Sequence, residues 1–313
     1  MDVKVSVIVL TYNQEKTINR TIDSIINQNV DFYYEIIIGD DASTDGTRDI
    51  CRFYAEKYDH IHLLLQKTNK GVVQNYIECL GKVSGKYIMG CAGDDWWGNT
   101  RKMGDQVHYL DSNPDCALVF GGYKVYNEIS DKLHDCPMPI RDYSTKDLIQ
   151  KYPIAALTIC FRNYDGLLRE LQKDIAIAHF PMEDYPLSLL LSRRGRVHCM
   201  GGNYATYSIS RGSISNCSTL FRKEKFEMGV FNVRLYYYSK FGFDDGYTLE
   251  RIKDTFYLSL STNGIRYNDR KYCVDNIAKI KHKRLSDIVK FILASTNVGF
   301  RFLRYINKKE NLK

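Results

Sequence analysis

Four short apolar runs, each followed by a segment with helical periodicity, constrain the fold of the first hundred residues. The runs start at Val5, Glu35, Ile61 and Lys86, and they read VSVIVL, EIIIG, IHLLL and KYIMGC. Such runs are typical of strands that are covered on both faces, and the segments between them place apolar residues three and four positions apart. Strands that alternate with helices predict right-handed βαβ units and a mostly parallel sheet.

The stretch 85–97, GKYIMGCAGDDWW, is the candidate centre of the chemistry. Asp94 and Asp95 follow the fourth predicted strand, and Gly90 and Gly93 bracket the sharp turn that leads to them. Open α/β sheets bind ligands at the carboxyl ends of their strands, where the strand order reverses. The alternative is that the two aspartates only form a turn or cap a helix.

Two more acidic pairs follow predicted elements: Asp40 with Asp41 after the second strand, and Glu183 with Asp184 near the start of a helix. A carboxylate in a crevice can accept the N3–H of uracil, hold a divalent cation, or remove a proton from a hydroxyl. Transfer of a sugar from a nucleotide diphosphate needs all three. Taken alone, the first pair also fits a turn and cap, and the second also fits a complement to the helix dipole.

Beyond residue 97 the alternation of strands and helices loosens. The patterns predict helices over 99–111 and 182–194, a short helix opened by the capping box at 144–147, strands over 117–126, 156–161, 195–199 and 203–209, and only helices from about residue 213.

The net charge of +7 belongs to the end of the chain. Residues 270–313 hold 12 Lys and Arg against 3 Asp and Glu, so the rest of the chain is slightly acidic. A nucleic-acid enzyme more often carries its basic residues around the active crevice, so no nucleic-acid partner is expected. The hypothesis for the tail is an anionic membrane surface, bound by a helical face of apolar residues beside a basic face, although an ordinary docking helix explains the apolar stripe equally well. The apolar residues are Leu285, Ile288, Val289, Ile292, Leu303 and Ile306, and the basic ones are Lys290, Arg301, Arg304 and Lys308.

Several classes of protein are disfavoured. No apolar run is long enough to span a bilayer and the first ten residues lack the features of a signal peptide, so a cytoplasmic location is expected. The nine cysteines include no CxxC pair, which argues against a zinc site or a disulfide framework. The loop after the first strand contains no glycine, which argues against a dinucleotide-dependent oxidoreductase.

Taken together and in this order, the motifs resemble glycosyltransferase family 2, the inverting nucleotide-sugar transferases of the GT-A fold. The resemblance runs from Val5 to about Ser215, and its carriers are VSVIVLTYNQ, EIIIGDDASTDGT, NKGVVQN, GKYIMGCAGDDWW, PMEDYPL and YSISRGS. It implies an α/β transferase domain, residues 1–215, with a mostly parallel central sheet. Residues 216–313 would then form a helical C-terminal region.

The resemblance also implies roles for single residues. Tyr12 would stack on uracil, Asp40 and Asp41 would contact the base and ribose, and Asp184 would be the catalytic base. Asp94 would be linked to a Mg²⁺ or Mn²⁺ ion, held weakly and only together with the donor. The remaining residues expected at the donor site are Thr11, Asn13, Ser43 and Asp95. The implied partners are a nucleotide-sugar donor, most simply a UDP-sugar, and a glycan or lipid-linked acceptor.

Two departures from the family pattern concern the metal. Ala92 stands where the first aspartate of an Asp-x-Asp motif is usual, and Ser210 stands where a histidine is frequent. These departures leave open a non-catalytic relative that binds nucleotide-sugars without turnover. Arg211 is a candidate to share the diphosphate charge. Trp96 and Trp97 fit either an apolar face for a sugar ring or the core.

Overall fold

The computed structural model describes residues 2–209 and 219–312, and the side chains of 2–209 and 219–307. The chain divides into two compact units. The first comprises residues 1–126, 134–145 and 153–208, and the second comprises residues 127–133, 146–152 and 209–313. Ser210 and Arg211 lie outside the described residues, and so does the side chain of Lys308.

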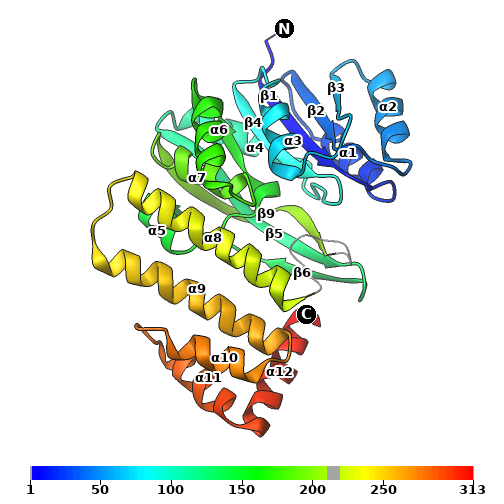
Figure 1. Cartoon of the computed structure of the whole chain (residues 1–313). Helices are drawn as coiled ribbons and strands as arrows, with labels where there is room; N and C mark the ends of the chain where they lie inside the picture. Colours follow the sequence, from blue (N-terminus) through cyan, green and yellow to red (C-terminus); the bar gives the residue numbers. More distant parts are fainter. Residues whose placement is uncertain (1, 210–218, 313) are drawn as a thin grey trace. The chain divides into compact units, whose positions relative to one another are not determined.

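The strands of the described residues form a single mixed sheet in the order β3-β2-β1-β4-β8-β5-β9-β7, with β6 paired to β5 (Figure 1). The first four strands are parallel, and β8 runs antiparallel to β4 and β5. The strands are β1 Val5–Thr11, β2 Tyr34–Asp40, β3 Ile61–Leu65, β4 Tyr87–Ala92, β5 Cys116–Asn127, β6 Lys132–Cys136, β7 Arg141–Tyr143, β8 Cys160–Arg162 and β9 Arg196–Ile209. The predicted α/β architecture is confirmed.

Helices cover both faces of the parallel part of the sheet (Figure 1). Val5, Val7 and Val9 face the main core, which α1, α2 and α4 close. Alternate residues of β1 and β2 face the other side, where α3 contacts both strands. The helices of this unit are α1 Ile18–Ile26, α2 Thr47–Lys57, α3 Val72–Leu80, α4 Lys102–Ser112, α6 Leu167–Ala178 and α7 Asp184–Leu191, with a 3₁₀ turn at Ala156–Thr158.

The second unit is built mainly from helices. Thr219, Asp245 and Asp269 cap α8, α9 and α10, because each side chain accepts a hydrogen bond from a backbone N–H in the first turn. No helix of the described residues is long and apolar enough to cross a membrane. The helices are α5 Thr145–Gln150, α8 Leu220–Lys240, α9 Gly246–Arg266, α10 Arg270–Ala278, α11 Leu285–Ser295 and α12 Asn297–Leu312.

Some local expectations were wrong. The strand expected over 156–161 starts with a 3₁₀ turn, closed by the Thr158 hydroxyl on the Ala155 carbonyl, and only Cys160–Arg162 pairs as β8. The strands expected over 195–199 and 203–209 are one strand, β9. Three elements were not expected: α6, β6 and β7. The two short strands are mostly exposed and polar, so tertiary pairing rather than an apolar pattern defines them.

A close approach of α3 to β2 depends on a glycine. The Asn75 amide donates to the Gly39 carbonyl at 2.8 Å, and a Cβ on Gly39 would lie 2.4 Å from the Cys79 sulfur. Since real Cβ contacts are essentially never this short, a side chain at position 39 requires the side chains of Cys79 and Asn75, or α3 itself, to shift.

We therefore expect Gly39→Ala to lower the free energy of unfolding by about 1–3 kcal/mol, the usual cost of overpacking a core. Gly90→Ala is the matched control, because a Cβ there meets only the Ile8 carbonyl at 3.9 Å. Urea unfolding of both variants measures the effect. Equal stability of the two variants would contradict the close approach.

Candidate functional site

The ends of β1, β2 and β4 lie side by side. The parallel register pairs Thr11 with Asp40 and Leu10 with Ala92, so the residues that follow each strand meet at the carboxyl edge of the sheet. Strand order reverses here, because β2 and β3 lie on one side of β1 and β4 on the other. This is the position at which α/β sheets bind ligands.

The loops after β1 and β2 are locked to each other. The Asn13 N–H donates to the Ser43 hydroxyl at 2.9 Å, and the Thr44 N–H donates to the Asn13 side-chain oxygen at 2.8 Å. Asn13 adopts a positive φ of 53°, which asparagine tolerates better than most residues. Tyr12 precedes Asn13 in this loop and is 46% exposed, so its ring is accessible at the carboxyl edge of the sheet. Thr11 is buried, and its hydroxyl has no hydrogen-bond partner among the described residues.

Asp40 and Asp41 are buried, and both carboxylates already bind protein groups. Asp40 forms an ion pair with Arg48 and accepts the Ser43 N–H at 3.2 Å. The two oxygens of Asp41 accept the N–H groups of Lys70 and Gly71 at 2.7 and 2.8 Å. In this structure both aspartates therefore hold the loops around the edge of the sheet in place.

The Asp94–Asp95 turn is fastened to the end of β9. The Asp95 carboxylate accepts the Ser208 N–H at 2.8 Å, and the Ser208 hydroxyl donates to the Asp94 carbonyl at 2.6 Å. Burial raises the pKa of the Asp95 carboxyl well above its usual range, and the neighbouring Asp94 adds to this rise. The Asp94 side chain is half-buried, so it is the more accessible carboxylate of the two.

Arg20 is a residue of this site that sequence reasoning missed. Its guanidinium lies 3.7 Å from the centre of the Trp96 ring and donates to the Asp94 carbonyl at 3.0 Å. It also donates to the Ser208 hydroxyl at 3.3 Å. The available signal was an arginine in the first turn of α1, where the helix dipole disfavours a cation and a specific partner is therefore expected.

The two tryptophans differ. Trp97 is only 2% exposed and belongs to the main core, so of the two alternatives for this residue the core is the one that holds. Its indole covers the buried ammonium of Lys102 at 4.1 Å, and burial lowers the pKa of Lys102 to about 8. Trp96 is half-buried, and its ring contacts both the guanidinium of Arg20 and the ring of Tyr126.

Glu183 and Asp184 lie at the amino end of α7, close to Tyr76 of α3. Burial and the adjacent Asp184 raise the pKa of Glu183 to about 8. Two neighbouring carboxyl groups cannot both ionise cheaply, so the pair holds a proton to a higher pH than an isolated carboxyl does, and the burial of Glu183 favours that residue as its holder. Asn75, the residue before Tyr76, binds the Gly39 carbonyl, and α3 thus links this acidic pair to the end of β2.

Few side chains of this site could act as metal ligands. Among the described residues no group of three or more His, Cys, Asp or Glu side chains could hold an ion. Asp95 is buried against Ser208, and Ala92 offers no ligand. Asp94 alone therefore suits a cation such as Mg²⁺, which can be held by one carboxylate together with substrate phosphates and water.

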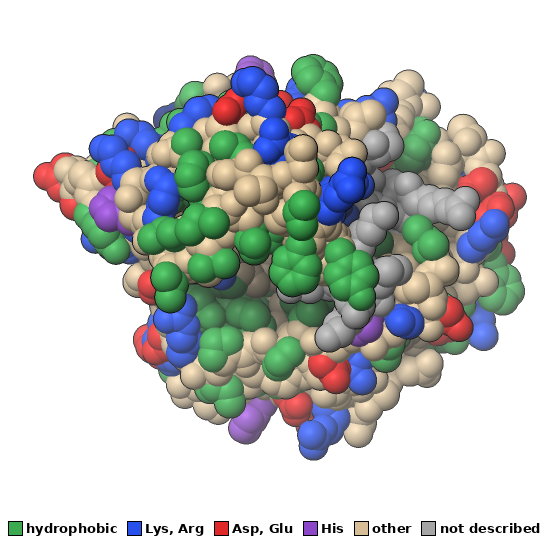
Figure 2. All heavy atoms as spheres, turned by 90° about the horizontal axis from the view of Figure 1, so that it is seen from below, with side chains coloured by type: hydrophobic (Ala, Val, Ile, Leu, Met, Phe, Trp, Pro, Cys, Tyr) green, Lys and Arg blue, Asp and Glu red, His purple; other side chains and the backbone are tan. Residues whose placement is uncertain are grey.

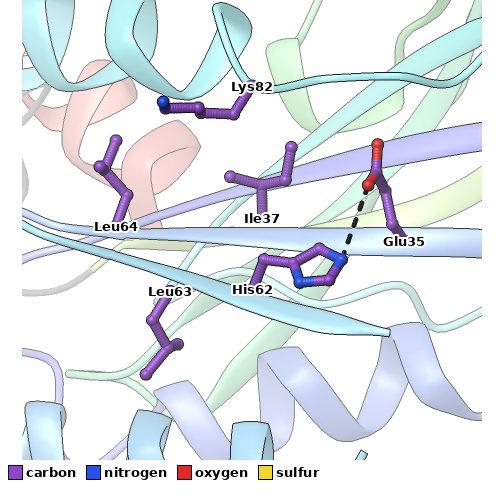
Figure 3. A pocket seen from close by; sticks show the side chains of 6 residues that line it. All are labelled: Glu35, Ile37, His62, Leu63, Leu64 and Lys82. Atoms are coloured by element: carbon purple, nitrogen blue, oxygen red, sulfur yellow. Dashed lines mark ion pairs between the residues drawn. The ribbon is translucent and has the colours of Figure 1, made fainter. Parts of the chain in front are cut away.

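One cavity lies away from this edge, over the early residues of β2 and β3 (Figure 3). It has a volume of about 340 Å³, and Glu35 and His62 face each other in it with 3.7 Å between their polar atoms. The Glu35 carboxylate also accepts hydrogen bonds from Ser6 and Ser84. This pocket contains none of the residues at the carboxyl edge.

Comparisons with known proteins identify the family of the chain. The family model "Glycosyl transferase family 2" matches residues 6–172. The putative glycosyltransferase EpsE of Bacillus subtilis is 40% identical over 40% of this chain and 45% of its own length. The Escherichia coli enzyme WfaP, named as a UDP-Glc:alpha-D-GlcNAc-diphosphoundecaprenol beta-1,3-glucosyltransferase, is 28% identical over 67% of this chain and 79% of its own.

The fold has solved counterparts. The structure of Staphylococcus aureus TarS residues 1–349 with UDP-GlcNAc matches with a TM-score of 0.64 at 18% identity, over 98% of this chain and 91% of that one. This chain spans only about half the length of the mycobacterial and Bacillus relatives that it matches. The family match covers more than half of the chain and includes every acidic pair of the site except Glu183 with Asp184. The chain therefore belongs to glycosyltransferase family 2.

Proposed function

We propose that this protein is an inverting glycosyltransferase that moves a sugar from a nucleotide-diphosphate donor, a UDP-sugar, to a hydroxyl of a glycan or lipid-linked acceptor in surface polysaccharide synthesis. The observation that carries the proposal is the meeting of three sequence motifs, at Thr11, Asp40 and Asp94, on one edge of the sheet. Residues 1–215 would form the transferase domain and residues 216–313 a helical appendage. A UDP-sugar is supported by the TarS structure in complex with UDP-GlcNAc and by the name of WfaP, which includes UDP-Glc.

In this proposal the donor lies across the edge of the sheet. The exposed ring of Tyr12 stacks on uracil, and Thr11, Asn13 and Ser43 surround the nucleoside. Asp40 and Asp41 shape the pocket for base and ribose through the loops that they hold. Asp94 lies at the diphosphate, and Asp95 fixes the turn that presents it.

The chemistry proposed is a single displacement. Asp184 accepts the proton of the acceptor hydroxyl while the oxygen forms a bond to the anomeric carbon. The bond between that carbon and the diphosphate oxygen breaks on the opposite side, so the configuration inverts and the nucleoside diphosphate leaves. When bound, Mg²⁺ or Mn²⁺ held by Asp94 would offset the charge of the diphosphate.

The proposed acceptor and location follow from the relatives. WfaP is named for a diphosphoundecaprenol acceptor, which is a membrane lipid. We place this protein in the cytoplasm, on the inner face of the cell membrane, where nucleotide-sugars and such lipids meet. The eight cysteines of the described residues are unpaired, in keeping with a reducing compartment.

A non-catalytic nucleotide-sugar-binding relative is the alternative, and Ala92 favours it because a metal ligand is missing there. Release of UDP from a panel of UDP-sugars, with and without acceptor, separates the two functions. Binding without any release, over the whole panel and in Mn²⁺, would favour the alternative.

The base is tested by Asp184→Asn, which preserves shape but removes basicity. We expect turnover to fall by roughly 10²–10⁴-fold, with donor affinity nearly unchanged. Glu183→Gln is the matched control and should retain most turnover, because Glu183 already carries a proton near neutral pH. Intact turnover in Asp184→Asn would refute the assignment.

The proton on Glu183 has a consequence for stability. The pKa of the Glu183 carboxyl is about 8 in the folded protein, above its ordinary value of 4.5. Its contribution to the free energy of unfolding is therefore complete below about pH 4.5 and is lost as the pH rises through 8. The melting temperature of the natural protein should therefore fall relative to that of Glu183→Gln between about pH 5 and pH 8.5. Thermal unfolding across this range measures it, and parallel curves would show that Glu183 is already ionised at pH 5.

Metal binding should depend on the donor. With Asp94 as the accessible carboxylate, Mn²⁺ needs diphosphate oxygens to complete its coordination. We expect calorimetry to show Mn²⁺ binding in the presence of UDP and little without it, and Asp94→Asn to weaken the former. Tight binding of Mn²⁺ to the protein without UDP would be inconsistent with this site.

A further inference from the structure

Helix α11 turns an apolar face outward. Leu285, Ile288, Val289 and Ile292 follow the spacing of one helical face, and they are 78%, 43%, 48% and 61% exposed. On a helix of a globular protein this outward side is normally polar. Four large apolar side chains in this position therefore need a partner outside the described chain.

Helix α12, which packs against α11, continues the pattern. Val298, Phe302 and Tyr305 again share one helical face, and they are 79%, 52% and 55% exposed. Arg301 is exposed on the same side of the helix. We refer to the seven apolar residues of the two helices as the α11–α12 face.

The inner sides of both helices are already used for packing. Ala294 and Phe300 are buried in a small core with Ile265 and Ile277, and Phe291 and Leu303 pack against it. The expectation that Leu303 shares a face with Leu285 was therefore wrong. The docking-helix explanation accounts for these inner residues and leaves the α11–α12 face unexplained.

The segment that carries the face is mostly basic, although Lys281 is paired with Glu250 of α9. Between residues 279 and 307 the only acidic side chain is Asp287, which is buried and bound by the backbone N–H and guanidinium of Arg284. The basic residues of the same segment are Lys279, Lys281, Lys283, Arg284, Lys290, Arg301 and Arg304. Figure 2 views the side on which α10–α12 lie, and it shows green apolar side chains near the centre of the view with blue Lys and Arg and red Asp and Glu side chains around them.

We infer that the α11–α12 face binds an anionic lipid surface, with its apolar side chains at the level of the headgroups and its cations among the phosphates. Apolar, aromatic and basic side chains on one exposed face are the features of interfacial helices. A second copy of the chain fits less well, because two faces with cations and almost no acids repel each other. The inference rests on the peripheral location proposed above and names the surface responsible.

Flotation of the full chain with vesicles tests this inference. The protein should float with vesicles of phosphatidylcholine and phosphatidylglycerol, less so at high salt, and little with phosphatidylcholine alone. Replacing Ile288, Ile292 and Phe302 together by Ser should abolish flotation. The double variant Arg301→Glu with Arg304→Glu should lower the affinity for the anionic vesicles by more than roughly fivefold per replaced cation, because the charge is reversed rather than removed.

The matched control is Phe53→Ser in α2, which replaces a phenylalanine of similar exposure, 59%, in the other unit. It should float like the natural protein. Melting temperature and UDP release with a soluble acceptor show whether each variant is folded and separate this inference from the proposed enzyme function. Undiminished flotation of the triple Ser variant would overturn the inference. The inference would also be overturned if the natural protein does not bind the vesicles and instead forms a dimer that the triple Ser variant disrupts.

Discussion

The site depends on the attachment of the Asp94–Asp95 turn to the end of β9. Three interactions contribute to it: the Ser208 N–H on the Asp95 carboxylate, the Ser208 hydroxyl on the Asp94 carbonyl, and the antiparallel bridge between Trp96 and Thr206. They join segments more than a hundred residues apart, and they add to the bonds that Thr17, Arg20 and Thr21 give to the carbonyls of the same turn. Burial raises the pKa of the Asp95 carboxyl. The same attachment fixes the position of Asp94.

The buried carboxylates of Asp40 and Asp41 also hold other residues of the sheet edge in position. Asp40 and Asp41 each bind two protein groups, and these bonds set the loops from which Tyr12 and Ser43 are presented. If Tyr12 and Ser43 contact the donor as proposed, the site is preorganised, because other residues already hold their loops in place. The loss of either carboxylate would therefore affect the site through loop position.

The distribution of charge around Asp94 differs from that of a metal site with several carboxylates. Ala92 contributes no ligand, and the guanidinium of Arg20 lies over Trp96 with a hydrogen bond to the Asp94 carbonyl. A permanent cation in this turn favours a bound diphosphate and opposes a free divalent ion. This arrangement supports the proposal that a metal ion binds only together with the donor.

Much of the fold could be read from local patterns. The apolar runs at Val5, Glu35, Ile61 and Lys86 identified the parallel strands, because a strand covered on both faces must be apolar throughout. The acidic motifs at Asp40 and Asp94 followed from their place after these strands. What only the tertiary structure decided are contacts between distant segments: the stacking of Arg20 on Trp96, the burial of Trp97, and the outward turn of the α11–α12 face while Leu303 packs inward. Helical periodicity gives the angle between side chains on a helix, but which angle faces the protein depends on what the rest of the chain places beside it.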